Sequence, residues 1–368
     1  MKHFGHFVAF IILAINALFT GLLLLTAYSP YIYPVTHPVQ SCLGLTFPIF
    51  ALINGCFLIF WLVIQRYKSA LLPLIGLLLC YSQIRTYLPI NFRTDNLPEG
   101  SIKILSYNIM GFDGASKKDG KNAILTYLKE SNADILCLQE YATVESPHYL
   151  TQKDIEKELV DYPHHRINAV GSANGYTNKI ACYSKYPILS ARVLKYTSEY
   201  NGSVVYELKL GEDTITLINN HLESNKLTKA DKDIYEGMLK SPEKEKVKSG
   251  ARLLIRKLAE ASAIRAPQAD TIVREIRSSR HPSVIVCGDF NDTPISYAHR
   301  VIAENLGDAF TQSGRGLGIS YNQNKFYFRI DNILISKNLK SYNCTVDHSI
   351  KESDHYPIWC YISMKNER

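Results

Sequence analysis

The chain has 368 residues, 46% of them hydrophobic, and a formal net charge of +7 at pH 7. It is longer than one ordinary domain needs, and its charge is not that of a polycation. The eight cysteines include no Cys-x-x-Cys pair, and Cys137, Cys182 and Cys287 lie in apolar runs typical of strands. Neither a disulfide framework nor a zinc site is therefore indicated.

Two uncharged runs near the N-terminus are each long enough to cross a bilayer as a helix. They comprise residues 7–26 and 43–64, and a third, shorter run reaches that length only if it extends over 69–84. A cleaved signal peptide fits the first run poorly, because the run is too long and no small-residue cleavage site follows. We predict a membrane anchor over residues 1–95 with two or three transmembrane helices.

The basic residues around these runs predict an orientation. Lys2 precedes the first run, Arg66 and Lys68 follow the second, and the loop between the runs has no lysine or arginine. Because cytoplasmic loops are enriched in these residues, the N-terminus and the second loop should be cytoplasmic. A third crossing then places everything after about residue 90 outside the cytoplasm, although Arg85 and Arg93 argue against it. We expect a multi-pass membrane protein, and no protein partner is evident.

After residue 100 the composition changes to short β-branched runs separated by turns and helical patches. This part carries 36 basic and 32 acidic residues, a net charge of +4 that only weakly favours an anionic ligand. Strands are predicted at 102–109, 133–140, 179–188, 203–210, 214–222, 283–291, 329–336 and 356–363. Helices are predicted at 121–131, 251–263 and 267–279. The charged stretch 224–250 is either a solvated surface insertion or a contact with substrate or a membrane surface.

Acids, amides or histidines stand at the ends or starts of six predicted strands. These residues are Asn108, Glu140, His221, Asp289 with Asn291, Asp331, and Asp354 with His355. Each alone fits a turn or a cap, but buried carboxylates are costly unless they are paired or bound to metal, so the set predicts a cleft. Oxygen ligands without cysteine suit Mg²⁺, and an aspartate with a separate histidine can form a base and its orienting partner. This chemistry suits water attack on a phosphorus ester.

The ordered series SYNI, DILCLQE, NNHL, GDFN, RIDNIL and SDHYP resembles the endonuclease/exonuclease/phosphatase superfamily. That superfamily includes pancreatic-type deoxyribonucleases, abasic-site endonucleases, sphingomyelinases and inositol-polyphosphate phosphatases. The resemblance covers Ser101 to about Met364 and implies a catalytic domain over residues 101–366. The implied fold is α/β, a four-layered α/β sandwich in which two packed β-sheets are flanked by helices.

The resemblance also implies a metal site and a base. Glu140 would be the main ligand of Mg²⁺ or Mn²⁺, with Asn108 beside it and Asp354 reaching the ion directly or through water. His355 would take the proton from the attacking water, and Asp331 would orient its imidazole. The activity implied is a membrane-anchored, metal-dependent phosphodiesterase.

Four further positions would handle the phosphate. Asp289 and Asn291 would position the nucleophile or the leaving oxygen together with the phosphate. His221 would stabilise the transition-state charge and protonate the leaving oxygen. Asn178, in GYTNKIACYSKYPI, lies where family members line the phosphate cleft.

Departures from the subfamily patterns leave two substrate classes open. Abasic-site endonucleases usually carry tyrosine where NNHL has His221, and the PAWCDR signature of inositol 5-phosphatases is replaced by NKFYFRIDNIL. The catalytic part has one tryptophan and no aromatic-basic interleaving for stacking on bases. The substrate is therefore either a nucleic acid or a phospholipid or other small phosphodiester. A catalytically silent, membrane-tethered binding module is the contrasting hypothesis, but Glu140, Asp289 and His355 are all retained.

Overall fold

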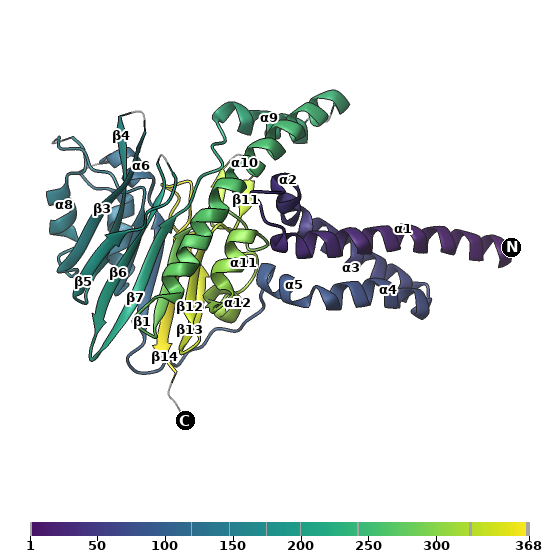
Figure 1. The fold of residues 1–368 in the computed structure, drawn as a ribbon, viewed down its shortest axis with the longest axis horizontal. Coiled ribbons are helices and arrows are strands. Elements are labelled where there is room, and N and C mark those ends of the chain that lie inside the picture. Colours follow the sequence, from purple (N-terminus) through teal and green to yellow (C-terminus); the bar gives the residue numbers. More distant parts are fainter. Residues whose placement is uncertain are drawn as a thin grey trace.

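A computed structural model of the protein describes residues 2–365 apart from 119, 147, 174, 199, 241–242 and 324–325. It shows an apolar helical rod from the N-terminal part, projecting from an α/β domain formed by the rest of the chain (Figure 1). The domain contains two packed sheets flanked by helices, which confirms the predicted fold class. The rod supplies the apolar helices predicted to precede it.

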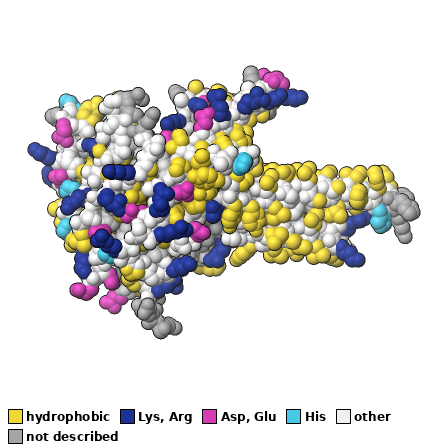
Figure 2. All heavy atoms as spheres, in the orientation of Figure 1, with side chains coloured by type: hydrophobic (Ala, Val, Ile, Leu, Met, Phe, Trp, Pro, Cys, Tyr) yellow, Lys and Arg dark blue, Asp and Glu magenta, His cyan; other side chains and the backbone are white. Residues whose placement is uncertain are grey.

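Three apolar segments form the rod, and its outer surface is covered by hydrophobic side chains (Figure 2). Its helices are α1 (Lys2–Tyr28), α3 (Phe47–Val63), α4 (Tyr67–Leu79) and α5 (Tyr81–Tyr87). By length and composition, Phe4–Tyr31 and Pro38–Val63 could each cross a membrane. The pair α4 and α5, bent by 62°, could form a third crossing.

Polar side chains inside the rod bond across helices. The Thr20 hydroxyl donates to Asn54 Oδ1 at 2.8 Å, and Trp61 Nε1 donates to Asn16 Oδ1 at 3.0 Å. Such bonds suit helices in lipid, where no water can satisfy these groups. Gly76 lets α4 approach α1 closely, since a Cβ there would lie 2.6 Å from a methyl carbon of Thr20. The three segments therefore pack as one bundle.

Two six-stranded sheets lie face to face in the domain. The first consists, in spatial order, of β13 (Leu339–Val346), β14 (Ile358–Met364), β1 (Ile102–Asn108), β2 (Ile135–Gln139), β4 (Tyr176–Ser184) and β3 (His164–Ala173). The second consists of β5 (Ile188–Val193), β6 (Gly202–Leu210), β7 (Asp213–His221), β8 (Val284–Asp289), β12 (Asp331–Ser336) and β9 (Leu306–Asp308). A hairpin, β10 (Tyr321–Gln323) and β11 (Phe326–Phe328), stands apart. The pairs β1–β2 and β7–β8 are parallel, so their carboxyl ends meet at one edge.

Helices cover the outer faces of both sheets. Those on the first sheet are α7 (Ala123–Glu130) and α8 (Gln152–Glu158), and those on the second are α10 (Lys244–Arg277) and α11 (Tyr297–Ala303). The remaining short elements are η1 (Ser29–Tyr31), α2 (Pro38–Ser41), η2 (Cys42–Thr46), α6 (Met110–Ala115), α9 (Lys229–Lys240) and α12 (Ala309–Ser313). The main core lies between the sheets, where Cys137 and Cys287 are fully buried among aliphatic side chains. These cysteines pack as small hydrophobes, as their apolar strands predicted.

The predicted break between two helices near Pro267 is wrong, because α10 runs through this residue. A proline inside a helix loses one backbone hydrogen bond and crowds the preceding turn. Buried contacts on both sides of the proline hold the helix together here. Arg265 Nη1 donates to the Glu223 carbonyl at 2.9 Å, and Gln268 Nε2 donates to the Thr197 carbonyl at 3.1 Å.

The predicted strand 179–188 is also wrong in its extent. The chain leaves the first sheet after Ser184 and enters the second sheet at Ile188. Pro187 stands at the crossing, where it cannot donate to a strand ladder. The strands at 164–173 and 339–346 were not predicted, since their polar residues interrupt the apolar pattern. The charged stretch 224–250 contains α9 and the start of α10, apart from the undescribed 241–242.

Candidate active site

The residues predicted at strand ends lie together at one edge of the two sheets. Asn108 ends β1, and Glu140 follows β2, its parallel neighbour. His221 pairs in register with Asp289 across β7 and β8, and Asp331 pairs with the same Asp289 across β8 and β12. Asp289 is thus the centre of the group. Strand pairing aligns His221, Asp289 and Asp331 in the second sheet, and the packing of the two sheets brings Asn108 to Asp289.

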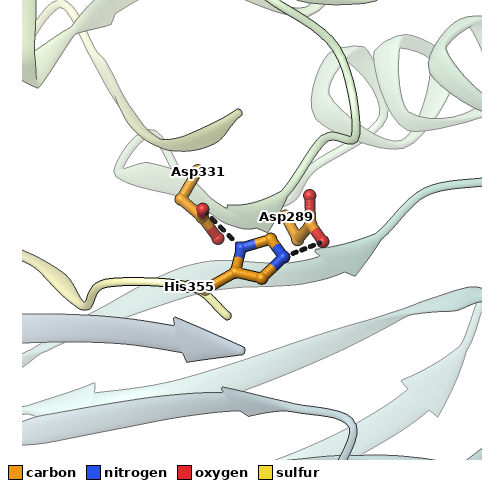
Figure 3. Close-up of side chains that lie close together, drawn as sticks. All are labelled: Asp289, Asp331 and His355. Atoms are coloured by element: carbon orange, nitrogen blue, oxygen red, sulfur yellow. Dashed lines mark hydrogen bonds and ion pairs between the residues drawn. The ribbon is translucent and has the colours of Figure 1, made fainter. Parts of the chain in front are cut away.

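His355 lies between two aspartates (Figure 3). Its Nδ1 is 2.8 Å from Asp331 Oδ2, and its Nε2 is 3.6 Å from Asp289 Oδ2. Burial opposes a charge on the imidazole, but the carboxylates of Asp331 and Asp289 outweigh it and raise the pKa of His355 to about 10. Burial and the Asp331 charge raise the pKa of Asp289 to about 6, against the pull of His355 and His221. The two carboxylates therefore hold the imidazole by charge as well as by geometry.

Asp289 is fixed by the turn that follows it. Asn291 donates its backbone N–H to Asp289 Oδ1 at 2.7 Å and its side-chain amide to Oδ2 at 3.1 Å. The same amide also donates to the Leu222 carbonyl at 3.0 Å. Gly288 has φ of 123°, and a Cβ there would lie 2.0 Å from the Asn220 carbonyl oxygen. Only glycine fits this position, so GDFN sets the position of its aspartate through backbone geometry.

Glu140 is an accessible carboxylate of the site, with 33% of its side chain exposed. Asn108 Nδ2 donates to Glu140 Oε1 at 3.1 Å and to Asp289 Oδ2 at 3.2 Å, while its Oδ1 accepts from the Met110 N–H at 3.3 Å. Burial raises the pKa of Glu140, and the Asp354 carboxylate adds to the effect. Asn108 therefore orients Glu140, and its own oxygen would reach an ion only after the amide rotates.

A left-handed turn follows Asn108. Non-glycine residues in it, such as Phe112 and Asp113, have φ of 58° and 56°, a conformation that costs about 1–2 kcal/mol per residue. Asn122 holds the turn by donating to the Phe112 carbonyl at 2.8 Å. The turn buries Phe112 against Tyr141, with ring centroids 5.3 Å apart. The backbone N–H of Gly111 in this turn donates to the Glu140 carbonyl at 2.9 Å, so the turn holds the segment that carries Glu140.

His221 faces both acidic groups from the other side of the cleft. Its Nε2 lies 3.6 Å from Glu140 Oε1 and 3.6 Å from Asp289 Oδ2. Asn178 Nδ2 lies 3.2 Å from His221 Nδ1 and donates also to the Tyr200 carbonyl at 3.0 Å. Because an amide nitrogen can only donate, Nδ1 accepts and Nε2 carries the proton. Burial lowers the pKa of His221, against the Asp289 charge, so a neutral N–H donor points into the cleft.

Two groups of side chains could hold a divalent ion. Ligand atoms of Asp289, Asp331 and His355 lie within 4.8 Å of one another. However, both aspartate side chains are only 1% exposed, and His355 Nδ1 already bonds to Asp331. Mg²⁺ keeps waters and substrate oxygens among its ligands, which requires an accessible carboxylate. Glu140 with the half-buried Asp354 fits that requirement better.

Several positioning residues were not predicted from the sequence. Ser320 Oγ accepts the backbone N–H of Asp331 at 3.0 Å, and Ser353 Oγ donates to the Asn108 carbonyl at 2.7 Å. The Tyr321 ring meets the His355 ring edge-on at 5.1 Å. Serines and tyrosines are common throughout the chain, so only their three-dimensional contacts single them out.

The comparisons with known proteins agree with this architecture. The family model described as the endonuclease/exonuclease/phosphatase family matches residues 105–355, and a domain of unknown function matches residues 9–87. No curated protein shows a significant match to the chain.

Solved structures share the fold at low sequence identity. The human nocturnin catalytic domain with bound sulfate is 16% identical, with a TM-score of 0.51, over 75% of this chain and 97% of that one. TDP2 of D. rerio, complexed with a single-strand DNA product, is 17% identical, with a TM-score of 0.50, over 72% and 99%. A protein of this family from Beutenbergia cavernae is 14% identical, with a TM-score of 0.50, over 72% of each chain. The family match spans every predicted site residue, and the chain belongs to the endonuclease/exonuclease/phosphatase family.

Proposed function

We propose that the protein is a membrane-anchored, divalent-metal-dependent phosphoesterase that hydrolyses a phosphodiester by attack of water. The observation that carries this proposal is the buried His355–Asp331 pair. The other ring nitrogen of His355, Nε2, lies 3.6 Å from Asp289 Oδ2, in the same cleft as Glu140. A base, an orienting carboxylate and an accessible metal ligand are the parts that such a hydrolysis needs.

In this reaction His355 Nε2 takes the proton from the attacking water. Asp331 keeps Nδ1 protonated and stabilises the imidazolium that forms. Asp289, held by two bonds from Asn291, accepts the second hydrogen of the water and aligns it. Because two carboxylates raise the pKa of His355, the neutral base becomes abundant only at alkaline pH unless a nearby cation offsets their charge.

In the proposed reaction His221 donates a hydrogen bond to the phosphate group. Its Nε2–H points toward the cleft and donates to a phosphate oxygen or to the leaving oxygen. Asn178 supports this role by bonding to Nδ1, which fixes the tautomer. A neutral imidazole keeps its Nε2 proton, so the leaving oxygen takes its proton from solvent, and His355 later releases the proton of the attacking water to solvent.

The residues present suit Mg²⁺ or Mn²⁺. Glu140 would hold the ion, with Asp354 beside it, because these two are the carboxylates of the site that solvent reaches. When bound, the ion supplies positive charge that neutralises the phosphate in the transition state.

The arrangement of the rod favours an extracytoplasmic location of the catalytic domain. The N-terminus and the α3–α4 turn lie at the end of the rod far from the domain (Figure 1), and Arg66 Nη2 donates to the Gly5 carbonyl at 3.5 Å. The α4–α5 pair returns to the domain and would complete a third crossing. The far end carries Lys2, Arg66 and Lys68, which favours the cytoplasm. Fusions of alkaline phosphatase and green fluorescent protein to the C-terminus test this, and fluorescence without phosphatase activity would contradict it.

A substrate and metal panel on the full-length protein in detergent tests the activity. The substrates are bis(p-nitrophenyl) phosphate, a single-stranded DNA oligonucleotide and sphingomyelin, each with Mg²⁺, Mn²⁺ or excess EDTA. We expect hydrolysis of at least one substrate with a metal and none in EDTA. Full activity in EDTA would refute the metal dependence. Inactivity on every substrate with either metal would favour the silent binding module.

A further inference from the structure

The catalytic cavity has a wall made by the membrane anchor. Its volume is about 240 Å³, and its lining includes Glu140 and His355 of the catalytic cleft. The lining also includes Ser41, Cys42 and Leu45, which belong to the short turns between the first two long apolar helices. The anchor therefore contributes residues to the lining of the catalytic cavity as well as tethering the domain.

The junction between anchor and domain is tightly packed where this wall forms. A Cβ on Gly44 would lie 2.0 Å from the Ile295 carbonyl oxygen, so the two backbones touch. Ser41 Oγ lies 3.4 Å from Ser262 Oγ on α10. Arg300 Nε donates to the Pro30 carbonyl at 2.9 Å. These contacts hold the turns of the anchor in a fixed place beside the catalytic residues.

The cavity combines the polar catalytic group with many apolar side chains. The apolar lining includes Leu45, Leu227, Leu258, Ile295, Phe326 and Phe328. Among the described residues that line the cavity, the lysines and arginines are Lys226 and Arg265. Lys226 pairs with Glu223 at 3.0 Å, and Arg265 pairs with Asp292 at 3.2 Å. A groove for nucleic acid offers unneutralised cations to successive phosphates, and this cavity does not.

The arm formed by α9 and the start of α10 lies beside the cavity. It projects from the domain on the side of the rod (Figure 1), and Figure 2 shows lysine and arginine side chains along it. Tyr235 of α9 stacks on Phe326 with ring centroids 4.2 Å apart, which ties the arm to the cavity lining. Basic side chains in this position suit contact with the phosphate oxygens of lipid headgroups.

We propose that the anchor and the catalytic domain together form the substrate site, and that the substrate is a membrane phospholipid. Its phosphate lies between Glu140 and His355, and its apolar chain lies against Leu45, Leu258 and Phe328. The lipid enters where the apolar surface of the rod continues onto the domain (Figure 2). This inference rests on the proposed phosphodiesterase activity and names the substrate class of that site.

The test compares a lipid with a soluble diester in the same protein. Full-length protein in nanodiscs is given phosphatidylcholine, phosphatidylglycerol or sphingomyelin, and separately bis(p-nitrophenyl) phosphate or single-stranded DNA, with Mg²⁺. Leu45→Ala and Leu258→Ala should lower kcat/KM for the preferred lipid about tenfold relative to the soluble diester. Leu62→Ala makes the same change on the outer surface of α3, where the side chain is 47% exposed, and should leave that ratio unchanged.

The outcomes separate this inference from the proposed function. A preferred lipid whose relative turnover falls in both cavity variants supports it. Preference for DNA, or an unchanged ratio in both variants, overturns the lipid assignment while the phosphodiesterase activity stands. No hydrolysis of any of the five compounds contradicts the proposed activity and the lipid assignment with it.

A second measurement uses the wild-type protein and so does not depend on how the variants fold. A photoreactive group at the end of an alkyl phosphodiester should label η2 or the α10 segment around Leu258, and sphingomyelin or phosphatidylglycerol should compete. Labelling confined to the outer surfaces of α1 and α3 would contradict the proposed path of the chain.

Discussion

Asp331→Asn removes the negative charge beside His355, the proposed base, and nearly keeps the shape of the side chain. The bond between Asp331 Oδ2 and His355 Nδ1 is 2.8 Å long, and both residues are buried. A hydrogen bond to a charged group contributes about 1.5–3 kcal/mol. If this hydrogen bond stabilises only the imidazolium that forms in the transition state, its loss raises the activation free energy by that full amount. Because about 1.4 kcal/mol corresponds to a factor of ten, kcat should fall about 10- to 150-fold.

The same substitution should move the pH profile in a known direction. Asp331 is the main charge that raises the pKa of His355, so the asparagine variant should have a lower pKa there. The rise of kcat with pH should then begin at lower pH, although its plateau is lower. Turnover of bis(p-nitrophenyl) phosphate between pH 5 and about 10, at saturating Mg²⁺, measures both effects.

A matched control distinguishes a specific effect on the proposed base from the general effect of neutralising a buried aspartate. Asp308→Asn neutralises another buried aspartate, which bonds to the N–H groups of Phe310 and Thr311 outside the cleft. It should leave the midpoint of the pH profile unchanged. If Asp331→Asn kept more than half of the wild-type kcat and the same midpoint, Asp331 would not orient the base.

Three further predictions concern the metal, the fold and acid stability. Glu140→Gln should raise the Mg²⁺ concentration for half-maximal activity at least tenfold, and an unchanged requirement in a metal titration would exclude Glu140 as the main ligand. Gly288→Ala should destabilise the domain by about 1–3 kcal/mol or more, because φ is 123° and the Cβ meets a backbone oxygen at 2.0 Å; an unchanged melting temperature would refute this. Burial alone would raise the pKa of Asp308, but bonding to His299 and the Arg329 charge hold it well below its usual value. The stability that the Asp308 charge contributes is therefore present above the unfolded pKa of about 3.9 and is lost as the pH falls below it. Asp308→Asn should therefore flatten the fall of melting temperature from pH 5 to about pH 3.

Much of the site was predictable because most of its residues lie at or next to the end of a strand. Asn108, His221 and Asp289 end strands that pair in parallel, and Asp331 begins the antiparallel neighbour of Asp289. An apolar run followed by a polar residue marks a strand end in the sequence itself. The packing of the two sheets then brings those strand ends together. Recognising the strand ends in the sequence was therefore enough to predict a cleft lined by these residues.

The wall of the cavity could not be predicted in the same way. Leu45 reads as part of an apolar transmembrane run, and Leu258 reads as one residue of an amphipathic helix. Nothing in the hydrophobic pattern says that both line the cavity that contains Glu140, because contact between distant segments depends on tertiary packing. The close approach of Gly44 to Ile295 is likewise a property of two backbones that only the folded chain brings together.

The protonation roles of the histidines also needed the structure. The resemblance assigned the base to His355 and the phosphate contact to His221, but it gave no protonation state for either ring. In the structure, carboxylates on both sides raise the pKa of His355, whereas burial lowers that of His221. Such differences arise from neighbours distant in the chain, such as Asp289, which contributes to the pKa of both histidines, and no local motif records them.

The central claim is that His355 is the base of a metal-dependent phosphodiester hydrolysis. The most direct measurement is kcat of the full-length His355→Ala variant at saturating Mg²⁺, with His348→Ala, an exposed histidine outside the cleft, as control. Loss of a general base typically lowers the rate about 10²–10⁴-fold, so His355→Ala should fall by at least a hundredfold while His348→Ala stays near wild type. If His355→Ala retained more than about a tenth of the wild-type kcat, the base would have to be sought elsewhere in the cleft.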